Sequence, residues 1–477
     1  MDAGCTCKPQ RKSNLRGLYS NVNFGGMIER DIPNLLHYLV QMNTVSAKKT
    51  NSTANKLSSS DRAFHNWYRF VQSFPPHLVR EYLNRFGLNQ NTTILDPFCG
   101  TGTTLVEAKL HGIKNIGIEA NPMPCFATSV KIDWEINPKG LLEHSEKIAG
   151  AAQNCLQFWS KRKPLSLPED TFKLLLKDSI SPLPLHKTLV LLEQIHRFRD
   201  DRYIRYESLA LAKSLVFFVS NLHFGPEVGV HPTKKEDAPV IDAWLAEVQT
   251  IAEDLRTVTQ PHVSATVYNT DSRNLSVALQ PNSIDAVFTS PPYPNEKDYT
   301  RTTRLESVIL GFIRNKAELQ ALKKGLLRSN TRNVYKGDDD DKWVKENEDI
   351  QSIASTIEKK RIKLGKTSGF EKLYGRVTKL YFGGMARHLS ELRQYLKPGA
   401  HLGYVVGDQA SYLQVMIRTG QLLADIAVSQ GFELVGIDLF RTRLATATRK
   451  HMREEVVVLR WPGPSKRNGK RNGGTHG

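Results

Sequence analysis

Apolar and polar positions alternate along this chain with two different periods, which separate short strands from longer amphipathic helices. Residues 92–123, TTILDPFCGTGTTLVEAKLHGIKNIGIEANPM, predict a strand, a glycine-containing loop, an amphipathic helix and a second strand, which together form a βαβ unit. Apolar runs rich in β-branched residues predict further strands at 264–268, 284–288 and 453–461. Because strands alternate with helices, the pattern predicts an open, mostly parallel α/β sheet.

A long segment between two of the predicted strands has helical periodicity instead. Its apolar residues recur with helical spacing over several stretches that proline-bearing loops separate. These stretches are 140–159, 187–198, 203–221 and 239–257. We therefore expect a helical insertion over 135–259. A second insertion, over 314–372, is charged and contains KGDDDDKWVKENED, so we expect it to pack outside the sheet as a candidate recognition region.

The remaining segments are expected to assemble into one split α/β domain, which the two insertions interrupt. Its pieces are 61–134, 260–313 and 373–462. Residues 1–60 include a polar run and are expected to form a partly flexible leader. Residues 463–477 form a basic polar tail that we expect to be disordered.

The net charge of the chain is its most unusual bulk property. Lys and Arg number 66 against 48 Asp and Glu, a net charge of +18 over 477 residues, which favours a polyanionic partner such as nucleic acid. The apolar runs, such as residues 215–219, are far shorter than the ~20 residues of a membrane helix, and the N-terminal residues lack the apolar segment of a secretory signal. The few, irregularly spaced cysteines form no zinc-type pair, so we expect reduced thiols, no metal site and a cytoplasmic location.

The stretch TSPPYPNEKDYT, residues 289–300, directly follows the predicted strand 284–288. Proline cannot donate to a sheet ladder and its φ is fixed, so Pro291 and Pro292 end the strand and force the chain along a stiff path. Ligands of open α/β sheets bind at the carboxyl ends of the strands. The stretch is therefore either a rigid ligand-binding loop or an ordinary turn.

The motif DPFCGTGTT places Gly100 and Gly102 where a strand passes into a helix, so that the backbone can approach a ligand at the helix N-terminus. Leu105 stands where a dinucleotide fingerprint has its third glycine, and the motif lacks the Gly-Lys of a P-loop. Glu119 ends the second strand about 20 residues after the first glycine, where an acidic side chain takes ribose hydroxyls. A ribose site without a pyrophosphate site suggests S-adenosylmethionine, although a tight structural turn would also explain the glycines.

Together these motifs resemble the amino-methylating DNA methyltransferases, whose fold is a Rossmann-like S-adenosylmethionine methyltransferase sheet. The resemblance covers 64–123, 264–313 and 374–461, about half of the chain. It implies that Glu119 holds the ribose of the cofactor and that Asp271, in NTDSRNL, lies beside its adenine. The other residues implied to bind the cofactor are Asp96, Phe98, Gly100, Thr101 and Gly102. The segment around His65, Trp67, Phe74 and Pro75 resembles the part of the family that covers the methionine end of the cofactor.

The chemistry of amino methylation explains the residue types of the proline-containing loop. An exocyclic amine on an aromatic base is a poor nucleophile, because its lone pair is drawn into the ring until hydrogen bonds make the nitrogen more pyramidal. Ser290 Oγ and the Pro291 carbonyl, stiffened by Pro292, are expected to accept the two N–H hydrogens while Tyr293 stacks on the extruded base. No covalent enzyme intermediate is needed. Methylation at cytosine C5 requires an activated cysteine, and we interpret Cys125 as a packing residue.

The motifs leave the identity of the target open. Serine at the first loop position resembles the cytosine-N4 branch, whereas adenine-N6 enzymes usually carry Asp or Asn there and some carry Ser. The resemblance implies double-stranded DNA as the partner and a restriction-modification or phage-defence system, with a cognate endonuclease, as the setting. An RNA guanine-N2 methyltransferase, a protein-glutamine methyltransferase and a nucleic-acid binder with a degenerate core are competing hypotheses.

Two basic segments are candidates for DNA contact. Arg301 and Arg304 follow the proline-containing loop closely, and a basic run continues beyond them. Lys234 and Lys235 lie in a loop of the helical insertion, which could equally be a solvated lid. The acidic run 338–341 repels DNA and is expected to point away from it.

Overall fold

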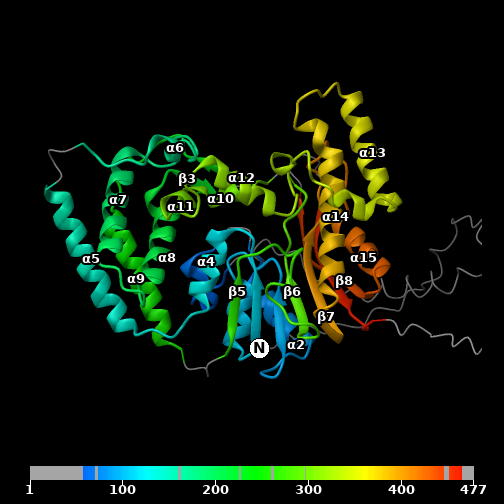
Figure 1. Ribbon diagram of the computed structural model, residues 1–477, viewed down its shortest axis with the longest axis horizontal. Helices are drawn as coiled ribbons and strands as arrows, with labels where there is room; N and C mark the ends of the chain where they lie inside the picture. Colours follow the sequence, from blue (N-terminus) through cyan, green and yellow to red (C-terminus); the bar gives the residue numbers. More distant parts are fainter. Residues whose placement is uncertain are drawn as a thin grey trace, which may run out of the picture. The chain divides into compact units, whose positions relative to one another are not determined.

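The structure is a computed structural model in which a central sheet is flanked by helices (Figure 1). It describes residues 57–69, 73–158, 163–224, 227–258, 263–295, 297–444 and 451–464. Nearly all of the expected leader and most of the expected tail lie outside these residues. None of the described helices is long and apolar enough to cross a membrane.

Seven of the described strands form one sheet in the order β5-β2-β1-β6-β7-β9-β8. Their bounds are β1 Thr93–Asp96, β2 Lys114–Ile118, β5 Ala265–Tyr268, β6 Ile284–Thr289, β7 Leu396–Gly407, β8 Glu433–Leu444 and β9 His451–Arg460. β9 runs antiparallel to β7 and β8, and the other neighbouring pairs of these strands are parallel. The strand order and the mostly parallel direction confirm the Rossmann-like α/β class that the sequence predicts.

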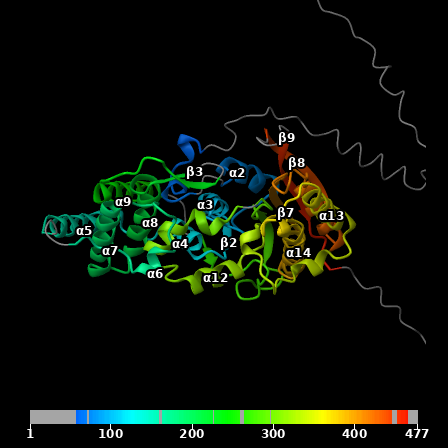
Figure 2. The same cartoon turned by 90° about the horizontal axis from the view of Figure 1, so that it is seen from above.

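Successive side chains of the central strands pack against helices on opposite faces of the sheet. The helices concerned are α2 (Pro76–Arg85), α3 (Thr103–Leu110), α14 (Tyr374–Leu392) and α15 (Thr419–Ser429). Ile94 and Phe288 join a buried cluster with α2 and α3, whereas Leu95 and Val287 join the cluster of α14 and α15. Figure 2 shows α2 and α14 on opposite sides of the sheet. Because both faces are covered, the ends of the strands are left for a ligand site.

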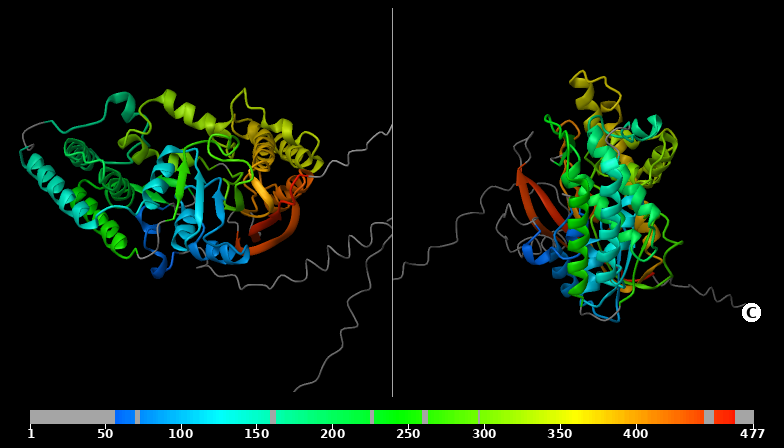
Figure 3. Two further views of the ribbon diagram at one scale, coloured as in Figure 1. Left: turned by 60° about the horizontal axis from the view of Figure 1, so that its bottom comes forward. Right: turned by 90° about the vertical axis from the view of Figure 1, so that its left-hand side faces the viewer.

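A helical region lies beside the β5 edge of the sheet, and its long helices run side by side (Figure 3). It contains α5 (Pro138–Phe158), α6 (Glu169–Phe172), α7 (Pro182–Arg197), α8 (Ile204–Ser214) and α9 (Val240–Arg256), and it follows α4 (Pro122–Lys131). These elements confirm the predicted helical stretches. The stretch predicted to be helical to residue 221 is different at its end. A π-helical turn over Leu215–Val219 leads into a hairpin of β3 (Leu222–Phe224) and β4 (Val228–Val230), and the two valines of β4 favour extended backbone.

The charged segment after β6 contains several short helices. Its elements are α10 (Tyr299–Thr302), α11 (Arg304–Ile309), α12 (Lys316–Gly325), η5 (Asp340–Val344) and α13 (Glu348–Lys363). The later elements η5 and α13 pack on α14. Gly383 of α14 leaves room for η5, because a Cβ there would lie 1.9 Å from the carbonyl oxygen of Asp340. Part of the acidic run is neutralised inside the protein, where Asp338 pairs with Arg328 at 2.8 Å and buried Asp340 pairs with Arg273.

Candidate active site

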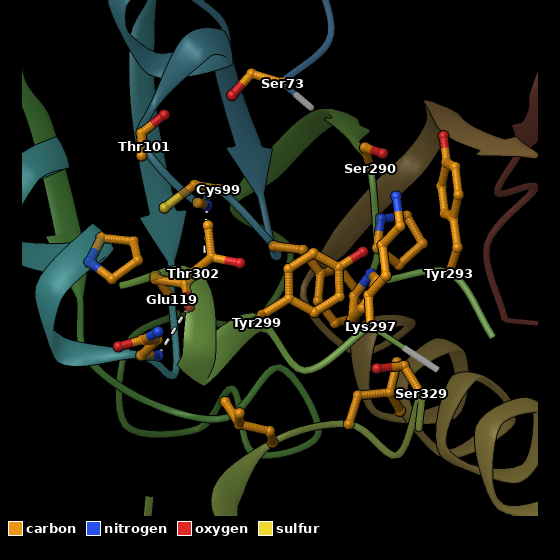
Figure 4. A pocket seen from close by; sticks show the side chains of 18 of the residues that line it. Ser73, Cys99, Thr101, Glu119, Ser290, Tyr293, Lys297, Tyr299, Thr302 and Ser329 are labelled. Carbon is orange, nitrogen blue, oxygen red and sulfur yellow. Dashed lines mark hydrogen bonds between the residues drawn. The ribbon is translucent and has the colours of Figure 1, made fainter. Parts of the chain in front are cut away.

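The carboxyl ends of four neighbouring parallel strands, β5, β2, β1 and β6, meet at one edge of the sheet, and a cavity of about 460 Å³ opens there. Ten of the residues predicted to bind the cofactor, the base or DNA line it. They are Phe98, Gly100, Thr101, Glu119, Asp271, Ser290, Pro291, Pro292, Tyr293 and Arg301. Figure 4 shows Cys99, Thr101 and Glu119 around one part of the cavity and Ser290, Tyr293 and Lys297 around the other. The cavity therefore joins the glycine-containing loop to the proline-containing loop.

The two glycines after β1 are needed for different structural reasons. Both are in the left-handed region, with φ of +51° at Gly100 and +81° at Gly102. A Cβ on Gly102 would lie 2.8 Å from Thr128 Cγ2, so the glycine is required by packing against α4. A Cβ on Gly100 would meet no protein atom within 4 Å, although Gly100 lines the cavity. Gly100 therefore leaves space for a ligand, whereas Gly102, which does not line the cavity, holds the shape of the loop.

Asp96 ties the two loops together rather than lining the cavity. Its Oδ1 accepts hydrogen bonds from Thr289 Oγ1 at 2.5 Å and from the backbone N–H of Phe98 at 3.1 Å. Burial raises the pKa of Asp96 to about 6, although these hydrogen bonds oppose the shift. Asp96 was expected to bind the cofactor, and its position between β1 and β6 instead gives it a structural role.

The carboxylate of Glu119 is held at the end of β2 by two backbone donors. Oε2 accepts from the N–H of Gly100 at 2.9 Å, and Oε1 accepts from the N–H of Asn121 at 2.8 Å. Burial raises the pKa of Glu119 to about 7, and the two hydrogen bonds counteract part of that shift. Each oxygen keeps a lone pair, so the carboxylate can still accept from ligand hydroxyls in the cavity.

Asp271 lies after β5 and is fixed by an arginine that the sequence did not reveal as a site residue. Arg273 donates from Nε to Asp271 Oδ1 at 3.0 Å and from Nη2 to Oδ2 at 2.6 Å. The same guanidinium binds Asp340 of η5, so the charged insertion is anchored at the wall of the cavity. The ion pair between Arg273 and Asp340 could not be recognised from the sequence, because the two residues are far apart along the chain and meet only in the fold.

The aromatic segment before α2 supports the cavity from the interior. Trp67 Nε1 donates to Asp254 Oδ2 at 2.7 Å, and His65 lies 2.8 Å from Glu107, so neither ring faces the ligand space. Phe74 and its neighbour Ser73 do line the cavity. The segment thus contributes fewer ligand-facing residues than the sequence suggests, because its first aromatic residues are committed to the core.

A buried lysine anchors the glycine-containing loop. Lys131, at the end of α4, donates to the carbonyl oxygen of Thr101 at 2.6 Å and to that of Tyr68 at 3.3 Å. Burial lowers the pKa of Lys131 to about 7. The hydroxyl of Thr101 is also buried, but it has no hydrogen-bond partner among the described residues. An orphaned hydroxyl in the wall of a cavity fits a polar ligand.

The SPPY loop, Ser290–Tyr293, carries its hydroxyl and its ring on a rigid path. Ser290 Oγ donates to the carbonyl oxygen of Val405 in β7 at 3.0 Å. Tyr293 packs against Gly407, where a Cβ would lie 3.1 Å from Tyr293 Cε2. Burial also raises the pKa of the Tyr293 hydroxyl. The absence of a side chain at Gly407 therefore gives the Tyr293 ring its place beside the cavity.

The four basic residues predicted to contact DNA lie in different surroundings. Arg301 lines the cavity. Arg304 is buried, and its guanidinium donates to the Thr300 carbonyl at 3.1 Å and to the Leu174 carbonyl at 3.2 Å. It cannot reach DNA from there, so its role is structural and that prediction is corrected. Lys234 donates to His231 O and Lys235 to Phe218 O, beside the β3–β4 hairpin.

Two further features of the site concern its chemistry. Burial raises the pKa of Cys125 to about 12, and the nearby Glu119 adds to the shift, so a nucleophilic thiolate is disfavoured.

The second feature was missed from the sequence: Arg441 and Arg443 of β8 and Glu454 of β9 line the cavity as well. Their signal is an i, i+2 pair of arginines, which by itself is also ordinary for a strand exposed on one face.

Comparisons with known proteins show which proteins this chain resembles. The family model N6_N4_Mtase, described as DNA methylase, matches residues 13–126. The chain is 28% identical over 483 residues to the Type II methyltransferase M.BsoBI of Geobacillus stearothermophilus, covering 93% of this chain and 92% of that protein. It is 24% identical to the Type II methyltransferase M.AvaI of Anabaena variabilis, covering 88% of this chain and 90% of that protein.

A shorter similarity reaches an enzyme that acts on RNA. A tRNA (guanine(10)-N2)-dimethyltransferase of Methanothermobacter thermautotrophicus is 45% identical over 47 residues, which are 10% of this chain and 14% of that protein. The similarity to the Type II methyltransferases extends over nearly the whole chain, whereas this one does not.

Proposed function

We propose that this chain, which is a DNA methyltransferase of the amino-methylating type and uses S-adenosylmethionine, modifies the exocyclic N4 amine of cytosine in duplex DNA. Membership in this class rests on the family match and on the relatives of nearly full length. The choice of cytosine is ours and rests on the SPPY loop. Serine at position 290 is the feature that favours cytosine over adenine, and the observation that supports a role for this loop is that the Ser290 hydroxyl donates its proton to the Val405 carbonyl.

The hydroxyl of Ser290 acts as an acceptor in this proposal. It has one proton, which goes to the carbonyl oxygen of Val405, so the lone pairs of Oγ remain for an N–H of the base. The Pro291 carbonyl supplies a second acceptor on the same stiff loop. Two neighbouring acceptors match the two N–H groups of an exocyclic amine and hold it with its lone pair toward the cofactor. Tyr293 stacks on the extruded base.

The other part of the cavity fits the cofactor. When bound, S-adenosylmethionine supplies an electrophilic methyl group. Glu119 would accept from the ribose hydroxyls, and the orphaned hydroxyl of Thr101 would gain a partner. Gly100 leaves the space that a side chain would fill. Asp271 would lie beside the adenine, and Phe98 adds an apolar wall.

The setting that we propose is a Type II restriction-modification system with a cognate endonuclease. The support is similarity to two Type II methyltransferases over 88% or more of this chain. Such an enzyme works in the cytoplasm on the DNA of its own cell. Duplex DNA is favoured over RNA because the RNA-modifying relative matches only 47 residues.

Nucleoside analysis tests the target directly. Duplex DNA free of methylation is incubated with the protein and S-adenosylmethionine, digested to nucleosides and analysed by mass spectrometry. We expect N4-methylcytosine, and roughly 10- to 1,000-fold less of it from the Ser290→Ala variant in the same time. N6-methyladenine would overturn the choice of base but keep the enzyme class. Modified RNA together with unmodified DNA would overturn DNA as the substrate.

A further inference from the structure

Two arginines of the β8–β9 hairpin form one wall of the cavity. Arg441 and Arg443 are two residues apart on β8, so their side chains lie on the same face of the strand. Glu454 lines the same wall from β9 and is the register partner of Arg441. Side-chain exposure rises from 11% at Glu454 to 21% at Arg441 and 42% at Arg443. The arginines thus extend from the cavity toward solvent.

Glu454 holds the two guanidinium groups side by side. Its Oε2 accepts from Arg441 Nε at 2.5 Å, and its Oε1 lies 3.5 Å from Arg443 Nε. Both interactions use Nε, so the terminal nitrogens stay available. Those of Arg441 have no hydrogen-bond partner among the described residues, and Arg443 makes one long terminal bond, 3.4 Å from Nη2 to the Asp408 carbonyl. The pair keeps a net positive charge after Glu454 is counted.

The pair borders the ring that we assign to the extruded base. Tyr293 and Glu454 pack against the same glycine: a Cβ on Gly407 would lie 3.1 Å from Tyr293 Cε2 and 3.3 Å from Glu454 Cγ. Groups anchored by Glu454 therefore lie next to the Tyr293 ring. A nucleotide whose base stacks on the Tyr293 ring would therefore place the phosphates of its strand close to Arg441 and Arg443.

We propose that Arg441 and Arg443 bind the phosphates that flank the extruded nucleotide, an inference that rests on the proposed function. A nucleotide that leaves the duplex carries its phosphates to the mouth of the cavity. Planar guanidinium groups bind phosphate through two parallel hydrogen bonds, and the terminal nitrogens needed for this are the free ones. Glu454 orients both groups beforehand, which lowers the entropy lost on binding. The hairpin thereby takes the DNA-contacting part that was expected of Arg304, which is buried.

DNA that carries uncharged methylphosphonates in place of two phosphates tests the inference with the wild-type protein. The modified site is first mapped on DNA that the protein has methylated, and short duplexes are then built around it. Methylphosphonates replace the two phosphates that flank the target base. We expect the affinity of the wild-type protein to fall roughly 10- to 100-fold, the range for hydrogen bonds to a charged group. An unchanged affinity would overturn the inference.

The double variant Arg441→Gln, Arg443→Gln, measured on the same two kinds of DNA, shows whether the arginines and these phosphates act on each other. We expect the dependence of log affinity on log salt to become shallower by about 1.8, since each lost phosphate contact removes about 0.9. The methylphosphonates should no longer weaken binding, because their partners are already missing. Cofactor affinity should match that of the wild type, which also reports a correct fold. The variant Arg441→Lys, Arg443→Lys should keep most of the salt dependence, because both charges remain.

Arg460→Gln is the matched control. Arg460 lies at the other end of the same hairpin and pairs with Glu433 at 2.8 Å on the surface, so we expect wild-type DNA binding. If the double variant and this control show the same salt dependence, the arginine pair does not bind phosphate. A wild-type protein that modifies no DNA would instead overturn the proposed function, and this inference with it.

Discussion

The hydroxyl of Ser290 donates to the carbonyl oxygen of Val405 at 3.0 Å, and this bond decides what the serine can do for a substrate. With its proton committed, Oγ is an acceptor for the amine of the base. We expect Ser290→Ala to lower kcat roughly 10- to 1,000-fold, on the scale of one preorganised polar contact, with cofactor affinity unchanged. Single-turnover methylation measures the first quantity and calorimetry the second.

The control for this prediction is another serine outside the cavity. Ser276 is exposed and bonds to Asn274 at 3.0 Å, so Ser276→Ala should methylate at the wild-type rate. Should Ser290→Ala also keep that rate, the SPPY loop would be a turn without a catalytic role.

Cofactor binding should depend on pH through Glu119. Burial raises the pKa of this carboxyl to about 7, and only its ionised form offers two charged acceptors to ribose hydroxyls. Affinity for S-adenosylmethionine should therefore fall as the pH falls through about 7. In Glu119→Gln, we expect binding weaker by roughly 1 to 3 kcal/mol and without this pH dependence. Calorimetry measures the affinity of both proteins for S-adenosylmethionine over the same pH series. If the two affinities changed with pH in the same way, Glu119 would not be the group that binds the ribose.

Glu119 should also make the stability of the protein depend on pH, but in the opposite direction to cofactor affinity. Its pKa in the folded protein is above the ordinary value of 4.5, so Glu119 favours folding below that value, and this contribution is lost as the pH rises toward about 7. In urea unfolding, the wild type should lose stability relative to Glu119→Gln across this window.

The motifs at the strand ends could be predicted because each is local. The glycines, Glu119 and the SPPY loop each follow an apolar run, and the parallel sheet brings the ends of those runs together. Periodicity also located the helices, although the stretch expected to be helical to residue 221 changes at its end, where α8 passes into a π-helical turn over Leu215–Val219.

The functions of charged residues could not be predicted in the same way. A basic run does not reveal whether its members face solvent, and Arg304 instead reaches the Leu174 carbonyl, 130 residues away in sequence. Asp340 was expected only to point away from DNA, and the structure shows it buried against Arg273. The wall of Arg441 and Arg443 depends on the register that places Glu454 opposite Arg441. These roles arise from long-range contacts, which composition and spacing do not encode.

Gly100 and Gly87 provide a matched pair for testing the cofactor site. Both have positive φ, +51° and +66°, and at both a Cβ would meet no atom within 4 Å, but only Gly100 lines the cavity. Alanine at either position should cost about 1 to 2 kcal/mol of unfolding free energy, because the left-handed region disfavours a side chain. Only Gly100→Ala should weaken cofactor binding strongly, since its methyl group would enter the ligand space. Equal cofactor affinities in the two variants would place the cofactor elsewhere.

Tyr293 should act through its ring rather than its hydroxyl. The ring packs on Gly407 beside the cavity, and burial raises the pKa of the hydroxyl, which therefore stays protonated at neutral pH. Tyr293→Phe keeps the stacking surface and should retain binding, whereas Tyr293→Ala should lose roughly 1 to 3 kcal/mol of base stacking. Fluorescence of 2-aminopurine at the target position should rise on binding to the Phe variant, because the base leaves the stack, and much less with the Ala variant. Phe158→Ala, at an exposed aromatic residue of α5 outside the cavity, should behave as the wild type. An Ala variant at position 293 with the full fluorescence change would show that base extrusion does not depend on this ring.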